Sequence, residues 1–294
     1  MNLFLDRSSS VIILSLVFLL MLLNWSLETV KWRYLIGKIE KISFINSFMA
    51  VWAGLTAGSF TPNRTGEFFT RAFILEKANR WEGIFITFMG SISQLIPTMI
   101  FGTTAAFLFI VSLNPGQYSD RILMYCLLLG VLLLVTIFLV IMYFRLPWLM
   151  RFFKKIIPHK YERFRIHMDV YNKYSFRELF NALVLSSIRY LVFTIQYCLL
   201  IKLCNIEIPF LHALMVVSLI FLVTTAIPTF ALTELGVRGS VSIVLMEMYF
   251  NNRSIMTDIS ANAFLASSMI WIINLIIPAI IGGFFVFRLK FFRR

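Results

Sequence analysis

Five long apolar stretches limit what this chain can fold into more than any other feature of its sequence. They cover residues 9–30, 83–112, 121–144, 179–204 and 260–287. Each is long enough to cross the hydrocarbon core of a bilayer as a helix, which takes about 20 residues. The chain is 60% hydrophobic and 14% charged, whereas soluble domains are about 45–50% apolar and roughly 25% charged. The sequence therefore predicts an all-α polytopic membrane protein with about five full spans.

Basic residues between these stretches predict how the chain is oriented. Segment 145–177 carries nine Lys or Arg residues, and four more follow the last stretch. The connection after the first stretch is also basic, through Lys31, Arg33, Lys38 and Lys41. Cytoplasmic loops are rich in Lys and Arg, and the segments 113–120 and 250–259 are nearly neutral. We expect a multi-pass protein of the cytoplasmic (inner) membrane, with its N-terminus outside and its C-terminus in the cytoplasm.

Two further regions, 43–80 and 208–250, are apolar but interrupted by proline, glycine and charge. Counting the crossings requires each region to return to the side from which it entered. In the first region the part after the interruption, 62–76, is about 15 residues long, which is short for a span. We therefore expect two broken or re-entrant helical hairpins, with full spanning pairs as the alternative.

The two interruptions resemble each other. They read TPNRTGEFFTR (61–71) and IPTFALTELGVR (227–238), and each contains a proline followed by Glu-x-x-x-Arg. Such a pattern predicts an inverted repeat, which is typical of secondary transporters whose sites lie where broken helices meet. The expected organisation is a helix–hairpin–helix repeat over 1–112, a linking span and basic cytoplasmic loop over 113–178, and an inverted repeat over 179–294.

Charged residues in these interruptions need a reason, because a charge at the bilayer centre costs about 2.5–3.5 kcal/mol. Glu and Arg four residues apart share one helix face and can pair, so one interpretation is that each arginine is simply neutralised by its own glutamate. The first interruption has an additional arginine, which leaves one positive charge. The alternative hypothesis is a binding site for a phosphate or carboxylate, lined by Arg64, Glu67, Arg71, Arg189, Glu234 and Arg238.

The backbone of the two interruptions is also predicted to serve this site. We expect Thr61 to cap a helix that starts at Pro62 and directs its N–H groups at the tip. Gly66 would let the backbone approach a ligand closely. At the second interruption, Pro228 breaks the helix, and Thr233 and Gly236 are expected to play similar parts.

Arg189 lies about ten residues into an apolar stretch, which is roughly 15 Å of helix at 1.5 Å per residue. Its expected partners are Gln196 or a hairpin glutamate, and otherwise it lines the predicted cavity. Gln94, Asn24 and Asn274 also lie in apolar stretches. Single amides of this kind usually form hydrogen bonds between helices.

Other classes of function find little support in the sequence. The histidines lack metal-ligand spacing and there is no phosphate-binding G-x-x-x-x-G-K-[ST] motif, so neither a metal nor a cofactor is predicted. No polar segment is long enough to form a nucleic-acid-binding domain, despite the net charge of +13. The expected partners are membrane lipids, with anionic lipid at the basic loop 145–177. That loop is alternatively a topology anchor alone, and a homo-oligomer is left open.

Three elements resemble landmarks of a known family. They are NWSLETVKWR (24–33), GSFTPNRTGEFFTR (58–71) and AIPTFALTELGVRG (226–239). Together they resemble the transmembrane region of lysylphosphatidylglycerol synthases, a flippase-like membrane protein family. The match to the family's first motif comes from Arg64, Gly66, Glu67 and Arg71. The second element departs from the family's pattern, because Thr229, Phe230 and Ala231 stand where glycine is common.

The resemblance implies lipid handling in a prokaryotic cytoplasmic membrane. In two-domain members the membrane part is thought to move aminoacylated phosphatidylglycerol, which a soluble domain makes. We expect no synthase activity here, since the chain has no room for that domain. The expected function is translocation of an anionic or aminoacylated phospholipid, or of a polyprenyl-phosphate-type lipid. The alternatives are a membrane enzyme that modifies headgroups, with Glu67 or Glu234 as base, and a non-transporting partner of a lipid-synthesis complex.

Overall fold

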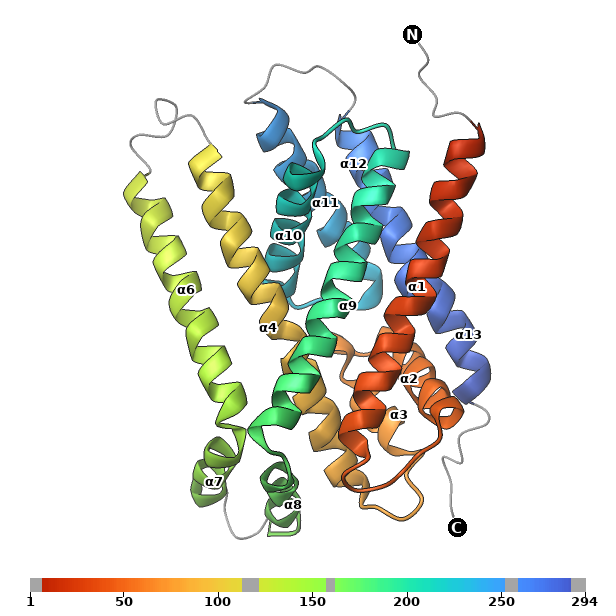
Figure 1. Cartoon of the computed structure of the whole chain (residues 1–294), viewed down its shortest axis with the longest axis vertical. Helices are drawn as coiled ribbons and strands as arrows, with labels where there is room; N and C mark the ends of the chain where they lie inside the picture. Colours follow the sequence, from red (N-terminus) through yellow and green to blue (C-terminus); the bar gives the residue numbers. More distant parts are fainter. Residues whose placement is uncertain (1–6, 113–121, 157–161, 252–258, 287–294) are drawn as a thin grey trace. The chain divides into compact units, whose positions relative to one another are not determined.

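The computed structural model describes residues 7–112, 122–156, 162–251 and 259–286, and within these ranges the regular structure is helical with no strand. The elements, labelled in Figure 1, are α1 (Arg7–Ile36), α2 (Phe44–Ser59), η1 (Pro62–Arg64), α3 (Gly66–Ala72), α4 (Arg80–Ser112), α6 (Ile122–Phe144), α7 (Leu146–Ile156), α8 (Glu162–His167), η4 (Met168–Lys173), α9 (Phe176–Leu203), α10 (Phe210–Ala226), α11 (Ala231–Asn251), α12 (Ile259–Trp271), the π-helical η5 (Ile272–Ile276) and α13 (Ile277–Val286).

Among the residues that the structure describes, five helical segments have the length and apolar composition to cross a membrane. They are Ser8–Ile36, Arg80–Ser112, Leu123–Phe144, Phe176–Leu203 and Ile259–Val286. Each overlaps one of the five apolar stretches of the sequence. The predicted all-α, multi-pass membrane architecture is therefore confirmed.

The chain divides into two compact units, and each is described by itself. Unit 1 comprises Met1–Asn24, Pro97–Thr136 and Tyr190–Ile276, and unit 2 comprises Trp25–Ile96, Ile137–Arg189 and Ile277–Arg294. The dividing points fall within α1, α4, α6 and α9, and between η5 and α13. Each unit contains one of the two interrupted regions.

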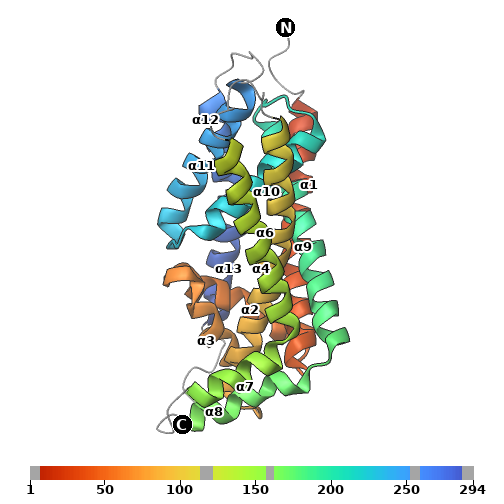
Figure 2. The same cartoon turned by 90° about the vertical axis from the view of Figure 1, so that its left-hand side faces the viewer.

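In unit 2, α2 and α3 form a helical hairpin that turns at residues 60–65. Asn63 and Arg64 make the turn with left-handed φ values of 48° and 56°. On α2 a Gly-x-x-x-Gly pair lets α3 pack closely, as small residues do between membrane helices. A Cβ on Gly54 would lie 2.9 Å from a side-chain carbon of Arg71, and the corresponding position at Gly58 is also occupied. The helices lie side by side in Figures 1 and 2.

The hairpin of unit 2 is also held by α13. The Thr56 hydroxyl donates to the carbonyl oxygen of Ala279 at 2.6 Å. Gly282 faces the backbone of Trp52, where a Cβ would collide with the Trp52 carbonyl oxygen. Close backbone contact on this side fixes α2, and α2 in turn fixes the position of α3.

Unit 1 contains the second hairpin. Here α10 ends at Ala226, residues 227–230 are not helical, and α11 begins at Ala231. The two helices pack against each other, and α11 also packs on α12. The Asn24 amide donates to the Asn274 side-chain oxygen at 3.3 Å. The predicted interhelical role of these two asparagines is therefore confirmed.

Two expectations about the basic connections need correction. Lys31 and Arg33 lie within α1 rather than in the following loop, and Lys31 is only 2% exposed. The loop predicted over 145–177 contains α7, α8 and η4. Figure 2 shows α7 and α8 close together, and both helices contact η4. A 2.5 Å ion pair between Lys154 and Asp169 joins α7 to η4.

Candidate functional site

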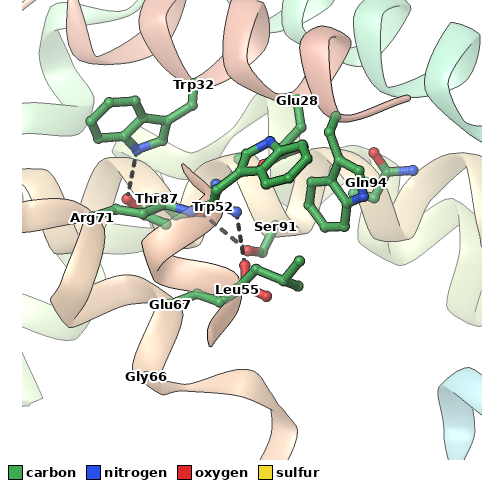
Figure 3. Close-up of polar contacts among 12 residues, drawn as sticks. Glu28, Trp32, Trp52, Leu55, Gly66, Glu67, Arg71, Thr87, Ser91 and Gln94 are labelled. Atoms are coloured by element: carbon green, nitrogen blue, oxygen red, sulfur yellow. Dashed lines mark hydrogen bonds and ion pairs between the residues drawn. The ribbon is translucent and has the colours of Figure 1, made fainter. Parts of the chain in front are cut away.

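Five ionised side chains form a buried network in unit 2. Glu28 of α1 is its hub, because its carboxylate lies 2.8 Å from Lys31 Nζ, 2.7 Å from Arg71 Nη1 and 3.1 Å from Arg189 Nη1. Arg71 also binds the Glu67 carboxylate through Nη2 at 2.8 Å. Figure 3 shows Arg71 with both glutamates.

Four helices bring these groups together. Glu28 and Lys31 are three residues apart on α1, and Glu67 and Arg71 are four apart on α3, so each pair shares one helix face. Arg189 reaches the network from α9. From α4, the Gly90 carbonyl oxygen accepts from Lys31 at 3.2 Å, and the Gln94 side-chain oxygen accepts from Arg189 at 3.2 Å.

Burial makes the pairing necessary. Glu28 is 6% exposed and Arg71 is 3% exposed. Ions lose most of their hydration at such depth, and breaking a buried pair by removing one partner leaves a charge without compensation. The carboxylate of Glu28 is therefore what keeps three cationic side chains in one place.

The ion pairs among the described residues leave the network with excess positive charge and with unpaired donors. Three cationic and two anionic side chains leave one positive charge in excess. In the part of the chain that the structure describes, the buried Nε of Arg71, the Nε of Arg189 and the indole nitrogens of Trp25 and Trp52 have no acceptor. All four atoms are hydrogen-bond donors. An anion beside these side chains would balance the excess charge and accept from those donors that face it.

The ion pairs predicted within each hairpin are confirmed, but two expectations for Arg189 are wrong. Its carboxylate partner is Glu28 of α1 rather than a hairpin glutamate. Gln196 is not a partner, because its amide donates to the carbonyl oxygen of Val17 at 2.9 Å in unit 1. Gln196 was predicted because it is near Arg189 in sequence, whereas the observed partners, Glu28 and Gln94, come from other helices.

The prediction that Thr61 caps a helix beginning at Pro62 is also wrong. Pro62 begins a single short turn, and Thr61 makes no capping bond to it. The left-handed φ values of Asn63 and Arg64 end that turn, so α3 begins at Gly66 and is seven residues long. The Thr61 hydroxyl instead accepts from the Gly66 N–H at 2.8 Å and closes the hairpin.

Gly66 and Arg64 have definite places in this turn. A Cβ on Gly66 would lie 2.6 Å from the Ala57 carbonyl oxygen. The missing side chain therefore allows α3 to approach α2. Arg64 is partly exposed in the turn itself.

The second hairpin holds a comparable pair in unit 1. Arg238 lies 2.6 Å from the Glu234 carboxylate, four residues apart on α11. Its guanidinium carbon is 6.0 Å from the ring centre of Phe193 and 5.8 Å from that of Phe221, within the range of cation–π attraction. Nε and Nη1 of Arg238 are buried and have no acceptor among the described residues.

The backbone residues of the second interruption act locally. Pro228 lies in the non-helical connection. The Thr233 hydroxyl accepts from the Phe230 N–H at 3.0 Å, which is the reciprocal half of a capping box at the start of α11. Gly236 is exposed, and no neighbouring atom lies within 4 Å of the position that a Cβ would take.

Glu28, Lys31 and Gln94 were missing from the predicted site. The available signal was a Glu and a Lys three residues apart in the apolar first stretch, since opposite charges at that spacing face the same side of a helix. Because Lys31 was assigned to the connection after the first stretch, its pairing with Glu28 was not predicted. Gln94 gave no signal beyond being an amide in an apolar helix.

A carboxylate also joins the two connections at the base of the first hairpin. Glu40, between α1 and α2, accepts hydrogen bonds from the backbone N–H groups of Glu76, Lys77 and Ala78 at 3.1, 2.9 and 2.9 Å. Partial burial raises the pKa of Glu40, but these three donors outweigh it and hold the pKa below its ordinary value. The connection before α2 is thereby tied to the connection before α4.

The sequence model of the family described as "Lysylphosphatidylglycerol synthase TM region" matches residues 5–282. The chain belongs to this family. Searches of curated proteins and of solved structures gave no match. The family match concerns a membrane region and includes no synthase catalytic domain. The family assignment made from the three sequence elements is therefore confirmed.

Proposed function

We propose that this member of the family is a lipid translocase. It carries an anionic or aminoacylated phospholipid, or a polyprenyl-phosphate-type lipid, across the cytoplasmic membrane. The observation that supports this proposal is the buried network around Glu28, with one positive charge in excess and four unpaired donors. A lipid phosphate has the charge and the oxygen atoms that such a site lacks.

In this proposal Arg71 and Arg189 bind the phosphate through their unpaired Nε–H groups. Glu28 and Glu67 hold the guanidinium groups in position, and Lys31 offsets part of the charge of Glu28. Arg64, in the turn of the hairpin, contributes the outermost positive charge of the same site. Because Glu67 is engaged by Arg71, it serves as a positioning group rather than as a general base.

We also propose that the two hairpins are re-entrant and belong to an inverted repeat, with repeats over 1–112 and 179–294 joined by 113–178. The support is local: both interruptions form a Glu–Arg ion pair four residues apart just after a non-helical turn. In the second repeat, Arg238 and Glu234 take the parts of Arg71 and Glu67.

The shaping residues of the two turns have corresponding roles in the proposal. Five residues close the turns and set the start of each return helix in this proposal: Thr61, Pro62, Gly66, Pro228 and Thr233. The predicted role of Gly236 is not proposed, because it lies within α11 and faces open space.

The basic segment is proposed to lie on the cytoplasmic leaflet. On α7, Trp148, Phe152 and Ile156 are exposed and four residues apart, so they share one apolar face. Amphipathic helices with basic residues bind anionic lipid in this way.

The test is a translocation assay with the purified chain in liposomes. Fluorescent phosphatidylglycerol in the inner leaflet is protected from a membrane-impermeant quencher until it is moved. Arg71→Ala and Arg189→Ala are expected to lose most of the activity, whereas Arg177→Ala, which removes an exposed arginine of α9, retains it. Wild-type rates in both network variants would reject the proposed site.

A further inference from the structure

A cavity of about 660 Å³ lies in unit 1, where α9 ends and α10 begins. Its lining includes Lys202 and Asn205 at the end of α9, Glu207 in the connection, and Phe210 and Ala213 of α10. None of the side chains of the buried charge network takes part in it. The cavity is therefore a second candidate site, independent of the proposed translocation site.

The turn beside the cavity has a fixed geometry. Asn205 adopts a left-handed φ of 57°, which asparagine tolerates better than most residues. Its N–H donates to the Lys202 carbonyl oxygen at 3.1 Å, and the Ile206 N–H donates to the Ile201 carbonyl oxygen at 3.2 Å. This is a Schellman motif, and Ile201 and Ile206, which stand at the positions of its usual apolar contact, are both buried. Lys202 and Glu207 thus flank a rigid turn.

The lining of this cavity includes two side chains of opposite charge. Lys202 and Glu207 are both exposed, and neither side chain has an ion-pair or hydrogen-bond partner among the residues that the structure describes. Much of the remaining lining is apolar, and Phe210 is 56% exposed. A ligand that matches these surfaces carries a positive group, a negative group and an apolar part.

The position of the cavity favours a lipid. α9 is a candidate membrane span that ends at Leu203. Its end therefore lies near the boundary between hydrocarbon and headgroups, where charged and apolar parts of one lipid are both within reach. An anionic lipid without an ammonium group would leave the Glu207 carboxylate unmatched.

We propose that this cavity binds a zwitterionic phospholipid of the phosphatidylethanolamine type. Glu207 binds the ammonium group and Lys202 binds the phosphate. Ile206, Phe210 and Ala213 contact the upper part of the acyl chains.

Photo-crosslinking of the whole chain tests this assignment. The protein is placed in nanodiscs of phosphatidylethanolamine and phosphatidylglycerol in equal amounts, with a trace of phosphatidylethanolamine that carries a diazirine on one acyl chain. After illumination, the labelled peptides are identified by mass spectrometry. We expect labelling within residues 198–213. Glu207→Gln and Lys202→Gln should each reduce that labelling by about tenfold, as expected for loss of one charge-assisted contact.

Two controls keep this result separate from the translocation site. Arg71→Ala should leave the labelling of 198–213 unchanged even if it abolishes translocation. Both cavity residues are exposed, so their variants should elute as folded protein on size-exclusion chromatography. Equal labelling by a diazirine-bearing phosphatidylglycerol, unchanged labelling in both cavity variants, or cross-links that join two copies of the chain at this segment would each overturn the proposal.

Discussion

The two hairpins carry the same Glu-x-x-x-Arg pattern but build different surroundings for it. In the first hairpin, Arg71 binds two carboxylates at once and belongs to a network of ionised side chains from several helices. In the second, Arg238 has one carboxylate within salt-bridge distance and lies against two phenylalanine rings. The spacing of the motif therefore determines the local ion pair, while the packed helices determine whether that pair becomes part of a larger network.

Backbone packing differs between the hairpins as well. The return helix of the first is seven residues long and lies on two glycines of α2, whereas the return helix of the second is 21 residues long. Short helices are marginal by themselves and depend on tertiary contacts. The first hairpin should consequently be the more sensitive of the two to changes in its neighbours.

The largest effect is expected from Glu28→Gln. It leaves three cationic side chains with one remaining carboxylate, and removing one partner of a buried pair costs about 3–5 kcal/mol. We expect little folded protein on size-exclusion chromatography in detergent. Adding Lys31→Met to this variant removes one of the cationic side chains. The double variant should therefore recover part of the stability that Glu28→Gln loses. If the single variant is as stable as wild type, the network is not the structural centre of unit 2.

Alanine at matched glycines should separate the two hairpins. Gly58→Ala places a Cβ 2.6 Å from a carbon of Glu67 and should destabilise the protein by about 1–3 kcal/mol, as overpacking does. Gly236→Ala meets open space on α11 and should stabilise the helix by up to about 1 kcal/mol. Thermal unfolding followed by tryptophan fluorescence measures both. Equal shifts of the same sign would contradict the difference in packing.

Replacing each hairpin arginine by lysine compares the contributions of the two hairpins to translocation. Lysine keeps the charge but cannot form a fork between two carboxylates. We expect Arg71→Lys to slow translocation about tenfold, which corresponds to a barrier higher by roughly 1.4 kcal/mol, and Arg238→Lys to slow it less. A larger effect at Arg238 would make the second hairpin the main headgroup site.

The smallest effect concerns Glu40 at the base of the first hairpin. Its folded-state pKa lies below its ordinary value, so its stabilising contribution is present above about pH 4.5, the ordinary value. That contribution is lost as the pH falls through the lower folded-state pKa. The difference in unfolding temperature between wild type and Glu40→Gln should therefore shrink on acidification. A difference that is constant between pH 7 and pH 3 would show that the backbone contacts do not depend on the charge.

The sequence by itself determined the class of fold, the five candidate spans found among the described residues, and the two interruptions. These follow from the length of apolar segments and from proline and glycine, which act over a few residues. It also determined both Glu–Arg pairs, since residues four apart on a helix must share a face.

Only the tertiary structure decided which charges share one site. The hub, Glu28, is 43 residues from Arg71 and 161 from Arg189 along the chain, and no local rule relates such distant positions. The structure also shows that Lys31 is buried, and that α3 begins at Gly66 whereas the sequence predicted a helix starting at Pro62. In each case the outcome depends on the close approach of helices that are far apart in sequence, and their packing determines which polar groups lose water and must find partners.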